Sequence, residues 1–178
     1  MPPSLLARYI LPLALAALPA VAQEAPARTL VHAGRLIDGV AEQALPDQGI
    51  LIEGERIVRV GPWAELRSAD AGATILDLSG MTVLPGLIDN HTHVLLQGDI
   101  TSEDYDEQLL KESIPYRTIR ATMAARTALD HGFTTLRDLE TEGAMYADVD
   151  LRTAINRGVI PGPRLFVATR AFSATGMY

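Results

Sequence analysis

Residues 83–94 read Val-Leu-Pro-Gly-Leu-Ile-Asp-Asn-His-Thr-His-Val, and this stretch decides the fold of the chain. The apolar pair Leu87 and Ile88 predicts a short buried strand, and Pro85-Gly86 directly before it predicts the turn that leads into the strand. Two histidines follow at the expected carboxyl end of the strand. In parallel α/β folds that end carries the chemistry, so the stretch predicts an architecture and a site together.

The two histidines, His91 and His93, are separated by one residue. Side chains two apart on a strand point to the same face, so both imidazoles can bind one divalent metal ion, at about 2.0–2.1 Å each if the ion is zinc. The pair by itself is more typical of a solvated strand edge than of a metal site, and the apolar strand before it favours the metal interpretation. We interpret Asp89 as a carboxylate that orients a histidine rather than as a ligand.

Several segments together carry a resemblance to a known family. Residues 85–93 resemble the first-strand motif of the amidohydrolase superfamily. The enzymes of that superfamily are metal-dependent hydrolases with a distorted (β/α)8 barrel. Residues 132–138 resemble the second barrel strand of the branch of Xaa-Pro dipeptidases and imidazolonepropionase-like enzymes. Residues 162–164 and 173–176 resemble the segments around its third strand, and the ending resembles, more loosely, amidases that cleave ochratoxin-type N-acyl amino acids. The resemblance covers roughly residues 28–178.

Helices and strands alternate after the histidine pair. We expect a helix over residues 115–131, a strand over 133–139, a helix over 148–157 and a strand over 164–170. Alternation at this spacing is typical of βαβ units and a parallel sheet. The connection at residues 95–112 is acidic, and it is interpreted as a solvated face or a substrate lid.

The first of these helices has clear end signals. Ser113 is its expected N-cap, and Gly132 suits the position just after its end. Ile119 and Met123 are predicted to pack on the sheet with three further residues, Ala125, Ala128 and Leu129.

The predicted fold class is α/β with two domains. Residues 28–84 read as short strands, including a hairpin around Gly54-Glu55, and predict the amino-terminal part of a small β-sandwich. Residues 85–178 predict the first three βα units of a (β/α)8 TIM-like barrel. A complete barrel takes about 250 residues, so the chain is expected to be an amino-terminal fragment of a longer protein.

The first 22 residues are typical of a secretory signal peptide. Arg8 precedes an apolar stretch at residues 9–18, and Ala20-Val21-Ala22 suits the cleavage site. The apolar stretch is shorter than the roughly 20 residues of a membrane span. We therefore expect a periplasmic or secreted protein without a stable membrane span after cleavage, and a membrane anchor or unstructured leader is the alternative.

Composition limits the partners and the kind of metal site. The formal net charge is −7, which disfavours nucleic acid as a partner. There is no cysteine, so disulfides and cysteine-ligated zinc are excluded within this sequence. The remaining histidines are given structural roles: His32 on a strand, and His131 in a last helical turn where a cation favours the helix dipole. Homo-oligomerisation is left open.

The resemblance implies a metal-dependent hydrolase that cleaves amide or peptide-like C–N bonds, in dipeptides or N-acyl amino acids, with water activated by a divalent metal, expected to be zinc. In the family a carboxylated lysine bridges two metals and an aspartate accepts the proton. Both are expected beyond Tyr178, so the catalytic residues are unknown, the fragment alone is expected to be inactive, and His91 and His93 form half a site. Asp138 can orient a histidine or pair with a base such as Arg137. A non-catalytic remnant or binding module is the alternative.

Overall fold

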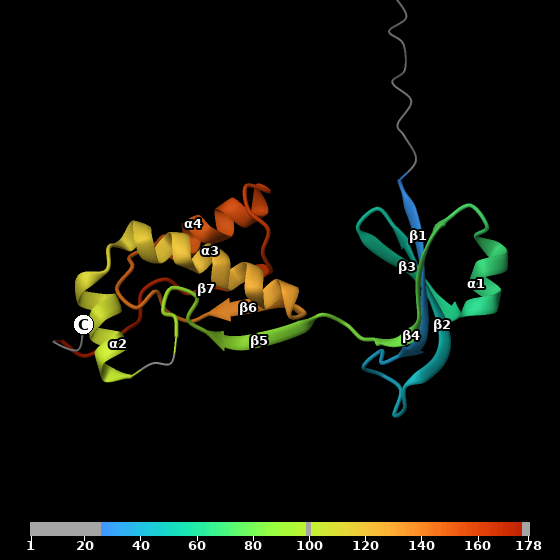
Figure 1. Cartoon of the computed structure of the whole chain (residues 1–178), viewed down its shortest axis with the longest axis horizontal. Helices are drawn as coiled ribbons and strands as arrows, with labels where there is room; N and C mark the ends of the chain where they lie inside the picture. The colour runs from blue at the N-terminus through green and yellow to red at the C-terminus, as the bar shows by residue number, and fades with distance from the viewer. Residues whose placement is uncertain (1–25, 99–100, 176–178) are drawn as a thin grey trace, which may run out of the picture. The chain divides into compact units, whose positions relative to one another are not determined.

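The computed structural model describes residues 26–98 and 101–175, so the predicted signal peptide lies outside the described residues and stays a prediction. The described chain forms two compact units, each with its own sheet (Figure 1). The first unit contains the described residues up to Arg35 together with Pro46–Thr82, and the second contains Leu36–Leu45 and the described residues from Val83 onward. Within the described ranges, no helix is both long and apolar enough to span a membrane.

The first unit is a four-stranded sheet with one helix. The strands are β1 (Arg28–Leu36), β2 (Leu45–Glu53), β3 (Arg56–Pro62) and β4 (Thr74–Val83), in the order β3-β2-β1-β4. β2 and β3 pair antiparallel, which confirms the predicted hairpin, and Gly54 supplies its positive φ of 57°. A second sheet packed on this one is not among the described residues, so the sandwich stays a prediction.

Helix α1 (Trp63–Ala69) was not expected from the sequence. It packs Leu66 against Leu30 and Leu51, and these side chains form the core of the unit. The residue before the helix is Pro62, which makes no side-chain capping hydrogen bond. A seven-residue helix without a capping residue therefore leaves little local pattern to recognise.

β1 continues through Gly34 to Leu36. A Cβ atom at Gly34 would overlap the backbone carbonyl of Ser79 on β4. Gly34 therefore permits a close approach of two strands. β4 runs without a break through Ser79 and Gly80.

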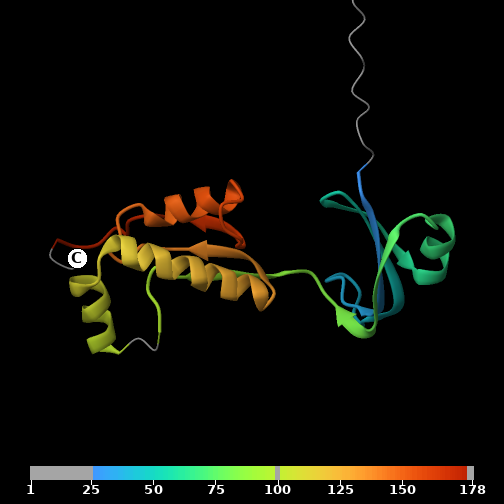
Figure 2. The same ribbon diagram turned by 45° about the horizontal axis from the view of Figure 1, so that its top comes forward.

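The second unit is a parallel sheet covered by helices. Its strands β5 (Leu87–Thr92), β6 (Phe133–Asp138) and β7 (Arg164–Val167) lie in that order, and both pairings are parallel. The long helices α3 (Ile114–Asp130) and α4 (Ala147–Asn156) alternate with the strands as predicted (Figure 2). The acidic connection, expected as a loop, contains α2 (Ser102–Asp106) and the π-helical turn η1 (Glu107–Lys111).

Both long helices share one core with the sheet. Ala121 and Ala125 of α3 are fully buried beside Leu136, Leu151 and Leu165. Their small side chains let the helix axis approach the strands closely, and Ser113 caps the helix through the backbone amide of Tyr116, as expected.

The inward face predicted for α3 was partly wrong. Ile119 and Met123 are 67% and 64% exposed, whereas Arg117, Ala121 and Ala125 are buried at a spacing of four residues. A helix advances 100° per residue, so Ile119 lies roughly 200° from Ala121 and points away from the sheet.

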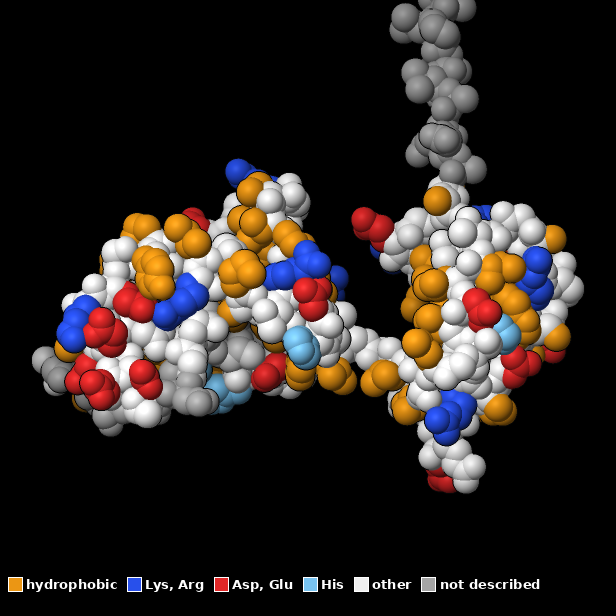
Figure 3. All heavy atoms as spheres, in the orientation of Figure 1, with side chains coloured by type: hydrophobic (Ala, Val, Ile, Leu, Met, Phe, Trp, Pro, Cys, Tyr) orange, Lys and Arg blue, Asp and Glu red, His pale blue; other side chains and the backbone are white. Residues whose placement is uncertain are grey.

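The opposite face of the parallel sheet carries apolar side chains on its surface. Ile88 is 62% exposed on this face, and Phe166 of β7 is 56% exposed. Leu87 is 41% exposed as well, so the predicted burial of Leu87 and Ile88 was wrong. Ile88, Thr135 and Phe166 line a hollow to which the described helices contribute one residue, Arg152 of α4, so no apolar side chain of a described helix lies in that lining. Figure 3 shows apolar side chains at the surface of each unit. The three βα units of a barrel therefore stay a prediction.

Substitution of Gly34 tests the close approach of β1 and β4. We expect Gly34→Ala to lower the free energy of unfolding of the first unit by about 2–3 kcal/mol, because the new methyl group meets backbone that no rotamer change can move. Gly80→Ala on β4 is the matched control, since nothing lies within 4 Å of a Cβ atom there. Urea unfolding of both variants provides the measurement, and equal midpoints would contradict the prediction.

Candidate metal centre

A β-bulge shapes the carboxyl end of β5. Asp89 pairs with Leu136 and Thr92 pairs with Asp138, so two residues on β5 stand opposite one residue on β6. The Asp89 carboxylate accepts a hydrogen bond from the backbone amide of His91 at 3.0 Å, inside the bulge. Bulges bend a strand and re-aim its side chains, and they are frequent next to active sites. Asp89 thus contacts the His91 backbone, and its predicted role in orienting an imidazole stays a prediction.

The bulge brings the two imidazoles together. The Nε2 atoms of His91 and His93 lie 3.4 Å apart, with ring centroids 5.3 Å apart and ring planes at 62°. A tetrahedral ion bound at about 2.0–2.1 Å by each of two nitrogens holds them roughly 3.3–3.4 Å apart. The spacing of the Nε2 atoms therefore fits two ligands of one divalent cation.

The described residues bring together two candidate metal ligands, His91 and His93. Within residues 26–98 and 101–175, no group of three or more His, Asp, Glu or Cys side chains is arranged to hold a metal ion. Catalytic zinc sites use three protein ligands and one open position. Two neutral imidazoles bring no charge, so the remaining ligands must include an anion.

Asp138 ends β6 directly beside the histidine pair. Its Oδ1 accepts a hydrogen bond of 2.8 Å from the Val94 amide, while Oδ2 is buried and has no hydrogen-bond partner. Burial raises the pKa of Asp138 to about 7; the Val94 amide and His93 oppose the rise, and Asp148 and Glu142 add to it. No ion pair joins Asp138 to Arg137. The carboxyl therefore fixes the backbone next to His93, and its action on the imidazole stays a prediction.

Two functional candidates were missed from the sequence, Glu142 and Arg117. Glu142 follows β6, is 6% exposed, and places Oε1 3.4 Å from Nδ1 of His93. Arg117 on α3 is 2% exposed and donates to the carbonyl oxygens of Leu95, Thr141 and Glu142 at 3.1, 3.2 and 2.8 Å. Burial lowers the pKa of Arg117, and the nearby carboxylates oppose this. The one signal in the sequence that could have indicated Glu142 is an acidic residue in the loop after a predicted parallel strand.

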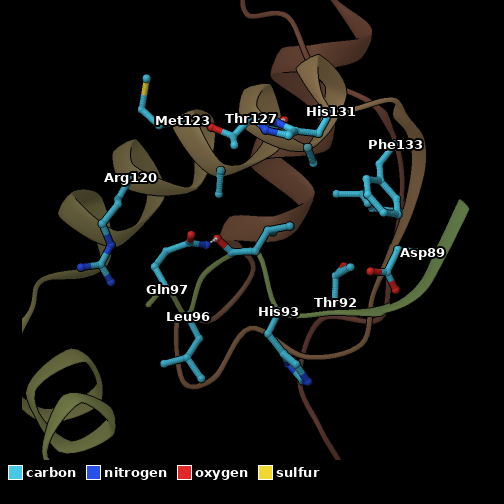
Figure 4. A pocket seen from close by; sticks show the side chains of 14 residues that line it. Asp89, Thr92, His93, Leu96, Gln97, Arg120, Met123, Thr127, His131 and Phe133 are labelled. Atoms are coloured by element: carbon cyan, nitrogen blue, oxygen red, sulfur yellow. Dashed lines mark hydrogen bonds between the residues drawn. The ribbon is translucent and has the colours of Figure 1, made fainter. Parts of the chain in front are cut away.

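An open hollow of about 770 Å³ lies on the helix side of β5. Arg120, Met123 and Thr127 of α3 and His131 directly after it line one wall, and Asp89, Thr92 and His93 line the other (Figure 4). The His93 imidazole points away from the helix, and His91 is not part of the wall. The hollow therefore does not contain the metal-binding face of the pair. His131 has no hydrogen bond with either histidine of the pair. Its Nδ1 instead lies 2.8 Å from the Thr127 carbonyl oxygen.

Residues 82–175 match the amidohydrolase family, and residues 49–69 match the bacterial imidazolonepropionase-like composite domain. The first match covers more than half of the sequence. The chain belongs to the amidohydrolase family. This result confirms the resemblance on which the metal interpretation was based.

Individual amidohydrolases support this assignment. The imidazolonepropionase of Acidiphilium cryptum is 40% identical over 106 residues, which is 56% of this chain and 23% of that protein. The imidazolonepropionase of Paenarthrobacter aurescens is 33% identical over 119 residues, 66% of this chain and 28% of that protein. This chain thus spans about a quarter of the length of the curated relatives that it matches.

Solved structures of amidohydrolases share the fold. A Xaa-Pro dipeptidase with bound methionine in the active site superimposes with a TM-score of 0.73 and 33% identity, over 84% of this chain and 35% of that chain. The ochratoxinase of A. niger gives a TM-score of 0.64 and 26% identity, over 81% of this chain and 31% of that chain. The mixed α/β fold of this chain is therefore similar to that of about a third of each of these amidohydrolase structures.

The raised pKa of Asp138 predicts a pH-dependent stability. Between about pH 4 and pH 7 the folded protein keeps a proton that the unfolded chain, with a pKa of about 3.9, has released. The free energy of unfolding therefore falls as the pH rises through this window, by about 1.4 kcal/mol per unit at most, and levels off above it. Asp138→Asn should remove this component.

Urea unfolding of both proteins between pH 5 and pH 8 tests this prediction. We expect the wild type to lose about 2–3 kcal/mol more than Asp138→Asn over that range. Parallel stability curves for the two proteins would show that Asp138 ionises at an ordinary pKa.

Proposed function

We propose that this chain contributes the first two ligands, His91 and His93, to the metal centre of a hydrolase that acts on carbon–nitrogen bonds. The observation that carries the proposal is the 3.4 Å separation of their Nε2 atoms at the carboxyl end of β5, inside the segment that matches the amidohydrolase family. A divalent cation bound there polarises a scissile carbonyl and lowers the pKa of a water molecule.

The protein residues have distinct tasks in this proposal. His91 and His93 bind through Nε2 as neutral rings. Asp89 holds the bulge that turns them to one side, through its contact with the His91 amide, and Asp138 fixes the Val94 amide beside them. The anionic ligand and the group that accepts a proton come from other strands, and we propose that the complete centre is binuclear and uses zinc.

The proposal also includes the complete fold to which the two sheets belong. We propose that β5, β6 and β7 are the first strands of a (β/α)8 barrel, and that the four-stranded sheet of the first unit is part of a β-sandwich. The exposed apolar side chains of Ile88 and Phe166 support further strands over that face, since large apolar patches are rarely left in water.

The proposed substrate is a small amide, such as a dipeptide or an N-acyl amino acid. The support is the similarity to a Xaa-Pro dipeptidase, whose name specifies dipeptide substrates, to an ochratoxinase and to imidazolonepropionases. We also propose a periplasmic or secreted location, supported by the first 22 residues.

A non-catalytic binding module is the second candidate function. It is favoured by one observation, that the described residues supply only two metal ligands. Under both functions we propose that the 178-residue chain by itself does not hydrolyse amides.

Zinc binding tests the site directly. We expect His91→Ala and His93→Ala each to weaken zinc binding by the 178-residue chain more than about tenfold, because each removes one of two converging ligands. His32→Ala is the matched control: His32 contacts Asp47 at 2.7 Å and stacks on Trp63 in the first unit. Competition with a chromophoric chelator measures the affinities, and equal binding by all variants would contradict the site.

An amide-hydrolysis assay tests the expected inactivity. The 178-residue chain, loaded with zinc, is incubated with a Xaa-Pro dipeptide and an N-acyl amino acid. We expect no turnover above that of the His91→Ala variant. Turnover that this variant loses would show that the missing ligands are not required.

A further inference from the structure

Glu142 has a burial and a backbone conformation that are both unfavourable for a glutamate. It lies in the loop after β6, is 6% exposed, and has a positive φ of 49°, which is uncommon for a residue with a side chain. Buried carboxylates and unfavourable backbone angles both cost free energy. Surrounding contacts must therefore hold this residue in place.

Two contacts fix the residue. The Tyr105 hydroxyl donates to its Oε2 at 2.7 Å, and the Arg117 guanidinium donates to its backbone carbonyl oxygen at 2.8 Å. Arg117 reaches the carbonyl and not the carboxylate. Among the described residues, the carboxylate forms no ion pair with lysine or arginine, so its free oxygen is available to a histidine.

That free oxygen faces the histidine pair. Oε1 of Glu142 lies 3.4 Å from Nδ1 of His93, and this Nδ1 is buried without a hydrogen bond. The other ring nitrogen of His93, Nε2, faces His91. A hydrogen bond from Nδ1 needs about 2.7–3.2 Å, so a movement of a few tenths of an ångström closes the contact.

We propose that Glu142 is the positioning residue of the metal centre, which holds the proton of His93 on Nδ1 and so presents the Nε2 lone pair to the cation. The inference rests on the proposed metal site. A neutral imidazole carries its proton on one nitrogen only, and the hydrogen bond made by one nitrogen decides which one is free to bind a metal. A carboxylate in this position also fixes the ring orientation and makes the imidazole a stronger ligand.

The neighbouring carboxyls do not take this role. Asp138 contacts the backbone amide of Val94, and Asp89 contacts that of His91. Both fix the main chain on which the rings stand. Glu142 alone among the three lies within ion-pair distance of an imidazole nitrogen.

Three variants of the 178-residue chain test the proposal by zinc affinity. Glu142→Ala removes the acceptor and should weaken zinc binding about 10–100-fold. Glu142→Gln keeps an oxygen acceptor and the shape of the side chain, so a smaller loss is expected. Glu103→Gln on the surface of α2 is the control for the change in charge and should bind as the wild type does. Chelator competition provides the affinities.

A second measurement reports on the proton itself. Nitrogen-15 chemical shifts of His93 in the metal-free chain at pH 8 distinguish the two neutral tautomers. We expect the Nδ1-protonated form in the wild type and a mixture that includes the Nε2-protonated form in Glu142→Ala. A role of Glu142 limited to loop stability would leave the tautomer unchanged.

The outcomes separate the two proposals. Zinc affinity within twofold of the wild type in both Glu142 variants, or an unchanged tautomer, overturns the positioning role while the metal site stands. Zinc binding that His91→Ala and His93→Ala leave intact overturns the metal site itself, and the inference with it. If Glu142→Ala does not fold, as circular dichroism would show, Glu142→Leu, which fills a similar volume and has no acceptor, decides by the same two measurements.

Discussion

The hydrogen bond from the Val94 amide to the Asp138 carboxyl joins the ends of β5 and β6, and the geometry of the second unit depends on it. Two further hydrogen bonds close the same junction, from the Thr92 hydroxyl to the Arg137 carbonyl oxygen and from the Leu139 amide to the Thr92 carbonyl oxygen, both at 3.0 Å. Because the bulge interrupts the regular ladder between Asp89 and Thr92, these contacts replace the pairing that the strand gives up there. The positions of His91 and His93 are well defined because these hydrogen bonds hold the backbone next to them.

The loops at this end of the sheet are held by buried polar groups as well as by apolar packing of Leu95 and Ala144. The Asp148 carboxylate accepts from the amides of Val149 and Thr169, as Asp138 accepts from Val94. The Arg117 guanidinium donates to carbonyl oxygens of two different loops. Desolvated charges of this kind are tolerated only when they are hydrogen-bonded, and in return they fix loops to a single arrangement. The small side chains of Ala121 and Ala125 bring α3 close enough for Arg117 to reach both loops.

Local patterns in the sequence predicted the elements whose causes are local. Ser113 and Gly132 bound α3 through capping contacts within a few residues, and the helix was predicted nearly to its ends. The role of Gly34 has no local signal, because the residue that requires a glycine there is Ser79, which is distant in the sequence. Glu142 was missed because a single acid in a loop has no periodicity, and its partners Tyr105 and His93 come from other segments. The histidine pair itself was found because one residue separates its two members in the sequence.

The sheet of the second unit leaves two requirements unmet by the residues that the structure describes. β5 and β7 each have one edge without a partner strand, and Ile88 and Phe166 present apolar surface to water. At the same end, two neutral imidazoles converge without the anionic ligand that a divalent cation needs. Additional parallel strands would pair the open edges, cover the apolar face and place acidic side chains at the carboxyl end, where His91 and His93 already stand. One cause thus accounts for the exposed face and the incomplete ligand set, which is the strongest physical argument for the proposed barrel.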